Sequence, residues 1–125
     1  MIIDNKKDQL VLFLESLNKL STRDSFKCTY AAGTSQAIEM LKYLVPDFLF
    51  LNYDLSRVNG LELLDILQRN KKLDKTIKVM YCVQAFDEIA EKAIKLGVKE
   101  CIPQPTDQAA FSEKLSELFN LDTRA

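Results

Sequence analysis

Residues with polar or reactive side chains stand at the ends of several short apolar segments of this chain. An aspartate at such a place offers a nucleophilic oxygen or a hard ligand for Mg²⁺, and a cysteine offers a nucleophilic sulfur. An amide side chain only accepts and donates hydrogen bonds. What these groups can do together depends on whether the fold gathers them at one place. The residues are Asp4, Asn5, Asn52, Asp54, Cys82 and Gln104, and Pro105 follows the last of them.

Several kinds of chemistry are excluded by the residue types that the chain lacks. It has 125 residues and no histidine, so it carries no Ser-His-Asp or Cys-His nucleophile and no histidine zinc ligand. Its three glycines are too scattered for a glycine-rich phosphate loop. The three cysteines, Cys28, Cys82 and Cys101, show no CxxC spacing, which argues against a zinc ribbon or a disulfide framework.

The charge balance and hydropathy narrow the set of partners. Seventeen Lys and Arg against 18 Asp and Glu give a formal net charge of -1, so no overall field attracts nucleic acid or an anionic membrane. No apolar run is long enough to span a bilayer, and no signal peptide opens the chain. We therefore predict a cytoplasmic protein with no membrane or nucleic-acid partner. The basic segment 69–78 is interpreted as a solvated helix end, because cations are favoured at helix C-termini.

Short apolar segments alternate five times with stretches whose apolar residues recur at helical spacing. Asn59 stands three residues before Glu62, as in a capping box, and Gly97 is placed to end a helix. Thr106 or Asp107 is placed to cap the last helix. The predicted strands are residues 2–3, 26–30, 48–51, 77–83 and 98–102.

This alternation predicts an α/β fold, with one doubly wound parallel sheet and helices on both faces. Residues 1–121 form the predicted domain, and 122–125 form a short C-terminal tail. In such sheets, ligands bind beyond the carboxyl ends of the strands. The polar residues that follow the strands are therefore expected to share one pocket.

The segment Pro46–Leu64 resembles the acceptor segment of the response-regulator receiver domain, the phosphoacceptor module of two-component signalling. It has the family's Pro-Asp pair, apolar strand, short loop and Gly60 ahead of an amphipathic helix, and Asp4 and Gly97 fall at the family's spacings. The resemblance covers residues 1 to about 120 and implies a receiver (flavodoxin-like) (βα)5 sandwich with strand order 2-1-3-4-5. It also implies a cis bond between Gln104 and Pro105.

The sequence departs from the family at most of the positions that the resemblance marks for chemistry. Asn52 stands where the family has the phosphoacceptor aspartate, and Asp4–Asn5 stands where an acidic pair holds Mg²⁺. The other replacements are Cys82 for a Ser or Thr, Gln104 for a Lys, and Cys101 for the aromatic switch residue.

These changes are consistent with one another and predict a pseudo-receiver that is not an enzyme. An amide is a very poor nucleophile, so Asn52 cannot accept a phosphoryl group. With Asp4 as the one acid left at the family's positions, no cofactor is expected and Mg²⁺ binds at most weakly. Without the family's other acids, a lysine at position 104 would be an unpaired charge, and the uncharged Gln104 avoids that cost.

Three alternatives remain at this stage. In the first, Asp54 or Asp4 is a surrogate phosphoacceptor, or Asp54 binds a metal ion together with Asp4. In the interpretation that we prefer, Asp54 is an exposed loop carboxylate. In the second, the more neutral pocket holds a small molecule. In the third, Cys82 and Cys101 form a redox switch, although no basic residue is evident nearby to lower either thiol pKa.

Two tyrosines lie one residue away from pocket positions. Strand alternation predicts that Tyr81 packs in the core, aimed away from Asn52 and Cys82, and that Tyr53 partly covers the pocket.

The predicted function is that of a stand-alone receiver-like signalling protein that acts through protein–protein contacts without phosphorylation. The expected partner is another signalling protein: a histidine kinase, a phosphotransfer protein or an effector. The resemblance implies that the fourth helix, fifth strand and fifth helix form the output face, and the chain is expected to be a monomer or a weak homodimer through it. That face would include Ala90, Lys95, Lys99, Glu100 and the exposed side of 108–118.

Overall fold

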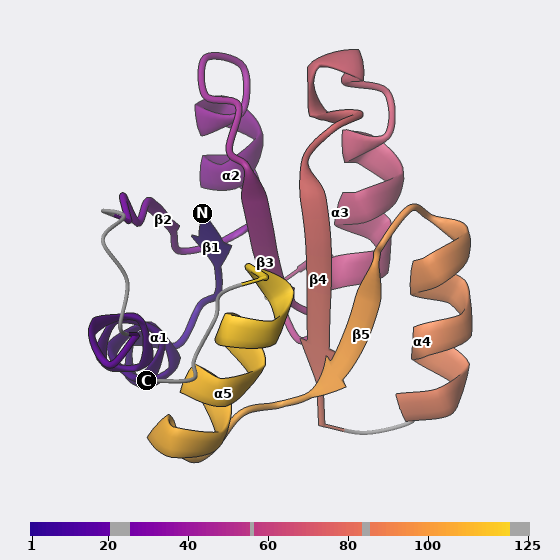
Figure 1. The fold of residues 1–125 in the computed structure, drawn as a ribbon. Helices are drawn as coiled ribbons and strands as arrows, with labels where there is room; N and C mark the ends of the chain where they lie inside the picture. The colour runs from indigo at the N-terminus through magenta and orange to yellow at the C-terminus, as the bar shows by residue number, and fades with distance from the viewer. Residues whose placement is uncertain (21–25, 56, 84–85, 121–125) are drawn as a thin grey trace.

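Five parallel strands form one sheet in the computed structural model, which describes residues 1–20, 26–55, 57–83 and 86–120 (Figure 1). The strand order is β2-β1-β3-β4-β5, and every neighbouring pair is parallel. The predicted fold class is therefore confirmed. The strands are β1 (Ile2–Ile3), β2 (Tyr30–Ala31), β3 (Phe48–Asn52), β4 (Ile77–Cys82) and β5 (Glu100–Pro103).

Helices cover both faces of the sheet (Figure 1). One core cluster joins α1 and α5 to the sheet, and the other joins α2, α3 and α4 to the opposite face. No helix in the described ranges is long and apolar enough to cross a membrane. The helices are α1 (Lys7–Asn18), α2 (Thr34–Met40), α3 (Gly60–Leu67), α4 (Phe86–Lys95) and α5 (Gln108–Leu118), with a one-turn 3-10 helix, η1 (Lys71–Leu73), before β4.

The predicted helix ends agree with the observed caps. The Asn59 side chain accepts a hydrogen bond of 2.9 Å from the Glu62 backbone amide at the start of α3. Of the two candidates for α5, Asp107 is the cap, since its carboxylate accepts from the amides of Ala109 and Ala110. Gly97 follows α4 with φ 95°, a left-handed conformation that glycine adopts without strain.

Strand boundaries differ from the prediction where a neighbouring strand is short. The second strand was expected over 26–30, but only Tyr30 and Ala31 form it, paired with Ile2 and Ile3. Because β1 offers two residues, Phe26 has no ladder partner and lies 39% exposed. The fifth strand is displaced to Glu100–Pro103, and the fourth ends at Cys82. The predicted tail, 122–125, lies outside the described residues.

Candidate functional site

The strand register brings three polar side chains into one row at the carboxyl end of the sheet. Asn52 is paired with Tyr81 across β3 and β4, and Asp4 follows Ile3, whose partner is Leu51. Paired residues of parallel strands point to the same face. Asp4, Asn52 and Tyr81 therefore all point toward the layer of α1 and α5, and all three are completely buried.

The carboxylate of Asp4 is held by donors on both oxygens. The Tyr81 hydroxyl donates to Oδ2 over 2.5 Å, and the Lys6 backbone amide donates to Oδ1 over 3.0 Å. The Asn52 Nδ2 amide group lies 3.4 Å from each oxygen. A buried carboxylate costs free energy unless such donors compensate it, so this arrangement satisfies Asp4 with the chain's own groups.

Tyr81 is one of two residues whose part in the site the sequence analysis did not identify. Its pKa is raised well above 10.0, first by burial and then by the charge of Asp4, so the phenol keeps its proton and donates. Strand alternation predicted that the Tyr81 side chain points away from both Asn52 and Cys82. It does point away from Cys82, but it lies on the same face of the sheet as Asn52. The register aligns Tyr81 with Asn52, and register is set by pairing between strands, which one strand's sequence does not contain.

The same register corrects the expectation for Tyr53. It was predicted to cover the pocket, but it packs against the core cluster of α2, α3 and α4. Tyr53 directly follows Asn52, so it points to the other face of the sheet.

Asp54 and Asn5 lie beside the buried row and are exposed. The Asp54 backbone amide donates to Asn52 Oδ1 over 2.9 Å, so the amide oxygen of Asn52 is also engaged. The nearby charge of Asp54 contributes to raising the pKa of Cys82, after burial, while the neighbouring Cys101 thiol opposes the rise. Asp54 therefore faces solvent next to the pocket and does not join the buried cluster.

Gln104 and Pro105, in the loop after β5, form a second cluster with Gln9 from the first turn of α1. Gln104 Nε2 donates to Gln9 Oε1 over 3.3 Å, and Gln9 Nε2 donates to the Pro105 carbonyl over 3.2 Å. Gln9 is a second residue that the sequence analysis did not identify. Its position two residues into α1 held no recognisable signal, because its partners come from the other end of the chain.

The predicted cis bond between Gln104 and Pro105 is wrong, since no described residue follows a cis peptide bond. The trans form is the ordinary state of an X–Pro bond, favoured by roughly 0.5–1 kcal/mol. With this trans bond, the Pro105 carbonyl accepts a hydrogen bond from the Gln9 side chain, and the Gln104 backbone amide donates to the Cys82 carbonyl over 3.1 Å.

Cys82 and Cys101 lie close together on neighbouring strands, on the same face as α2, α3 and α4. Burial and the adjacent Cys82 thiol raise the pKa of Cys101 to about 12. A thiolate is the reactive form of cysteine. The environment therefore suppresses the reactivity that a redox switch would require.

The donor set at this end of the sheet does not fit the Mg²⁺ ion that the family resemblance implies. Mg²⁺ needs hard, anionic oxygens with free lone pairs. The Asp4 oxygens already accept from Tyr81, Asn52 and Lys6. No group of three or more His, Cys, Asp or Glu in the described part of the chain is placed to hold a metal ion.

A five-stranded parallel sheet in this order is that of the flavodoxin-like α/β domains, a class that includes receiver domains. The chain matches the response regulator receiver domain family over residues 1–116. It belongs to that family, and hence to the proteins of two-component signalling.

Relatives with the same segment occur in longer proteins. The chain is 29% identical over 88 residues to a protein-glutamate methylesterase/protein-glutamine glutaminase of Caulobacter vibrioides, covering 70% of this chain and 25% of the relative. It is 27% identical over 120 residues to the sensory transduction protein LytT of Bacillus subtilis, covering 94% of this chain and 46% of the relative. The chain thus spans less than half the length of these relatives.

Solved receiver domains have the same fold at low sequence identity. The Mn²⁺-bound form of the response regulator Rcp1 superposes with a TM-score of 0.79 at 16% identity, covering 99% of this chain and 94% of that chain. The chemotaxis response regulator CheY4 of Vibrio cholerae gives a TM-score of 0.80 at 12% identity, covering 94% of both chains. These matches support the fold alone.

Proposed function

We propose that this receiver domain signals by binding another signalling protein and is not itself phosphorylated. The observation that carries the proposal is the state of Asp4, whose carboxylate is engaged by Tyr81, Asn52 and Lys6. The proposal involves no catalytic step, no Mg²⁺ and no other cofactor, and it places the protein in the cytoplasm.

The amide at position 52 is what the buried row requires. Asn52 presents its Nδ2 group to Asp4 and its Oδ1 atom to the Asp54 amide, so both ends of the side chain have partners. An aspartate at this place would set two carboxylates about as close as the amide now lies. Like charges at such a distance repel strongly in a buried site unless a cation joins them.

The partner surface of this proposal is the face formed by α4, β5 and α5. A salt bridge between Glu100 and Lys114 joins β5 to α5. Beside it lies a shallow pocket of about 380 Å³, lined by residues of β5, the following loop and α5. Lys95, at the end of α4, and Lys99, just before β5, are exposed. A kinase, phosphotransfer protein or effector would bind here, and the chain would be a monomer or weak homodimer through this face.

The test is an amide NMR titration with Mg²⁺, followed by beryllofluoride, which mimics an acyl phosphate. We expect no saturable shifts at Asp4, Asn52, Asp54 or Gln104. Saturable shifts centred on Asp54 would overturn the proposal in favour of a surrogate acceptor, since Asp54 is exposed to a phosphodonor.

A second experiment compares variants by their labelling with a small phosphodonor. Asn52→Asp alone is expected to remain unlabelled by a small phosphodonor, because Asn5 and Gln104 still lack the family's charges. The triple variant Asn5→Asp, Asn52→Asp, Gln104→Lys restores the family's acceptor, metal and lysine positions and serves as the positive control. Robust labelling of the single variant would contradict the proposal.

A further inference from the structure

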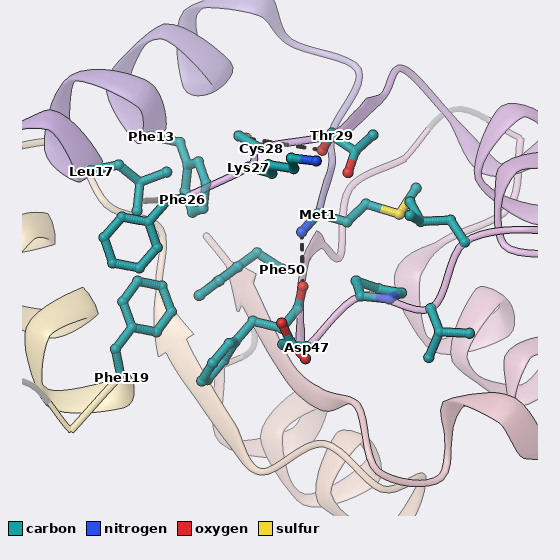
Figure 2. Close-up of a pocket in the computed structure, with 14 residues that line it drawn as sticks. Met1, Phe13, Leu17, Phe26, Lys27, Cys28, Thr29, Asp47, Phe50 and Phe119 are labelled. Atoms are coloured by element: carbon teal, nitrogen blue, oxygen red, sulfur yellow. Dashed lines mark hydrogen bonds between the residues drawn. The ribbon is translucent and has the colours of Figure 1, made fainter. Parts of the chain in front are cut away.

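An apolar pocket of about 750 Å³ opens at the amino end of the sheet, the opposite end from Asp4 and Asn52. Phe26 and Phe119 stack beside it with ring centroids 5.2 Å apart (Figure 2). Pockets of roughly 300–1,000 Å³ are the size that binds drug-like molecules. This pocket is therefore large enough for an aromatic or branched aliphatic side chain. Its phenylalanines are Phe13, Phe26, Phe48, Phe50 and Phe119.

Exposed apolar residues continue from the pocket onto the neighbouring loop. Val45 lines the pocket and is 53% exposed, and Tyr43, two residues earlier, is 87% exposed. Contiguous exposed apolar groups mark interaction sites, and tyrosine is enriched among the residues that dominate binding energy. The loop between α2 and β3 thus extends the apolar pocket outward.

Unpaired cations lie on the next loop, between α3 and β4. Arg69, Lys71, Lys72 and Lys75 are all exposed, and none takes part in a salt bridge with another described residue. Lys27 lines the pocket itself. Two carboxylates lie among these cations, Asp74 on the loop and Asp47 at the pocket. These five cations and two acids give this part of the surface a net positive charge.

Three hydrogen bonds hold the two loops side by side. Asn70 Nδ2 donates to the Leu41 carbonyl over 3.2 Å, and Thr76 Oγ1 donates to the Pro46 carbonyl over 2.7 Å. The Ile77 amide donates to the Asp47 carbonyl over 2.9 Å. The cations and the apolar rim are therefore presented together, and a preorganised surface loses less entropy on binding.

We infer that this amino-end surface, made of the phenylalanine-lined pocket, Tyr43, Val45 and the four cations of 69–75, binds an acidic protein segment. An aromatic or aliphatic side chain of the partner enters the pocket, and flanking Asp or Glu residues meet the cations. The inference deepens the proposed function, on which it rests, by naming a partner class and a second binding surface. This amino-end surface is distinct from the face of α4, β5 and α5.

The observations favour a protein segment over a nucleic acid. A nucleic-acid site needs a continuous basic stripe that follows the phosphates. Here Asp74 and Asp47 interrupt the cations, and the surface includes an apolar pocket, which a phosphate backbone does not fill.

The test uses a synthetic peptide with two glutamates on each side of one phenylalanine, titrated into the full chain and followed by amide NMR. We expect saturable, salt-sensitive shifts at Tyr43, Val45 and 69–75, and weaker binding when the peptide's phenylalanine is replaced by serine. The variant Lys71→Glu with Lys72→Glu should bind at least about tenfold more weakly. The matched control, Lys7→Glu with Arg57→Glu, makes the same charge change at two exposed residues at the other end of the sheet and should bind normally.

Three results would overturn the inference: no saturable shifts at this surface, equal loss in both charge-reversal variants, or tighter binding of single-stranded DNA or phosphatidylserine vesicles than of the peptide. The titration contains no Mg²⁺ or phosphodonor. A failure here therefore leaves the unphosphorylated state of Asn52 to be decided by the beryllofluoride titration.

Discussion

Asp4 shows how a single buried charge constrains its neighbours. Fully enclosed, it needs hydrogen-bond donors, and the row at the end of the strands provides Tyr81 and Asn52. An uncharged donor satisfies a carboxylate without adding a second charge to be buried. The neutral residues around Asp4 therefore satisfy this one acid with the chain's own hydrogen-bond donors.

At the scale of the residue, we predict that Tyr81→Phe destabilises the protein by about 1–3 kcal/mol. The substitution keeps the ring in the core and removes the hydroxyl that donates to Asp4 Oδ2. The measurement is the free energy of unfolding in urea. Tyr43→Phe is the matched control, because Tyr43 is 87% exposed, and its change should stay within about 0.5 kcal/mol. Equal effects of the two variants would contradict the role given to Tyr81.

At the scale of the element, the start of α3 is packed directly against the end of β3. A Cβ atom on Gly60 would lie 2.9 Å from the Asn52 carbonyl oxygen and 2.8 Å from Met80 Cε. The Gly60 amide also donates to the Tyr53 carbonyl over 2.8 Å. The short connection after β3 therefore depends on a residue without a side chain at the first position of the helix.

We predict that Gly60→Ala lowers the free energy of unfolding by about 1–3 kcal/mol, because the backbone of β3 must shift to admit the methyl group. Gly33→Ala is the control: a Cβ there would meet nothing within 4 Å, and its φ of -174° is extended. That variant should change stability by no more than about 0.5 kcal/mol. Thermal or urea unfolding midpoints decide the comparison, and a tolerated Gly60→Ala would refute the close packing.

At the scale of the whole molecule, two core clusters share one sheet between them. Titratable groups sit in both: Cys101, partly buried, packs against the first, and Tyr81, fully buried, belongs to the second. The pKa values of both groups are raised, Cys101 to about 12 from 9.0 and Tyr81 well above 10.0. The stability of the whole domain is therefore linked to alkaline pH through both faces of the sheet.

We predict that the free energy of unfolding falls as the pH rises above about 9. The unfolded chain releases these protons near 9.0 and 10.0, while the folded chain retains them until higher pH, so rising pH favours the unfolded state. Lys78, whose pKa is lowered by burial, acts in the opposite direction. Urea unfolding between neutral pH and about pH 11 measures the slope. The variant Cys101→Ala with Tyr81→Phe should flatten it, and an unchanged slope would contradict the assignment.

The sequence alone determined the class of fold and the helix caps, because both follow from local patterns. The alternation of apolar segments with helical stripes predicts a parallel α/β sheet, and Asn59, Asp107 and Gly97 act within their own turns. The departures from the family at Asn52, Cys82, Gln104 and Cys101 stay predictions from the resemblance, since they rest on residue type at matched positions.

Only the tertiary structure decided which polar groups meet. The register between β3 and β4 placed Tyr81 beside Asn52 and Asp4, and sent Tyr53 to the other face. Packing between the two ends of the chain paired Gln104 with Gln9. Register and long-range packing depend on the balance of contacts across the whole sheet, so residue types at fixed spacings along one segment do not contain them.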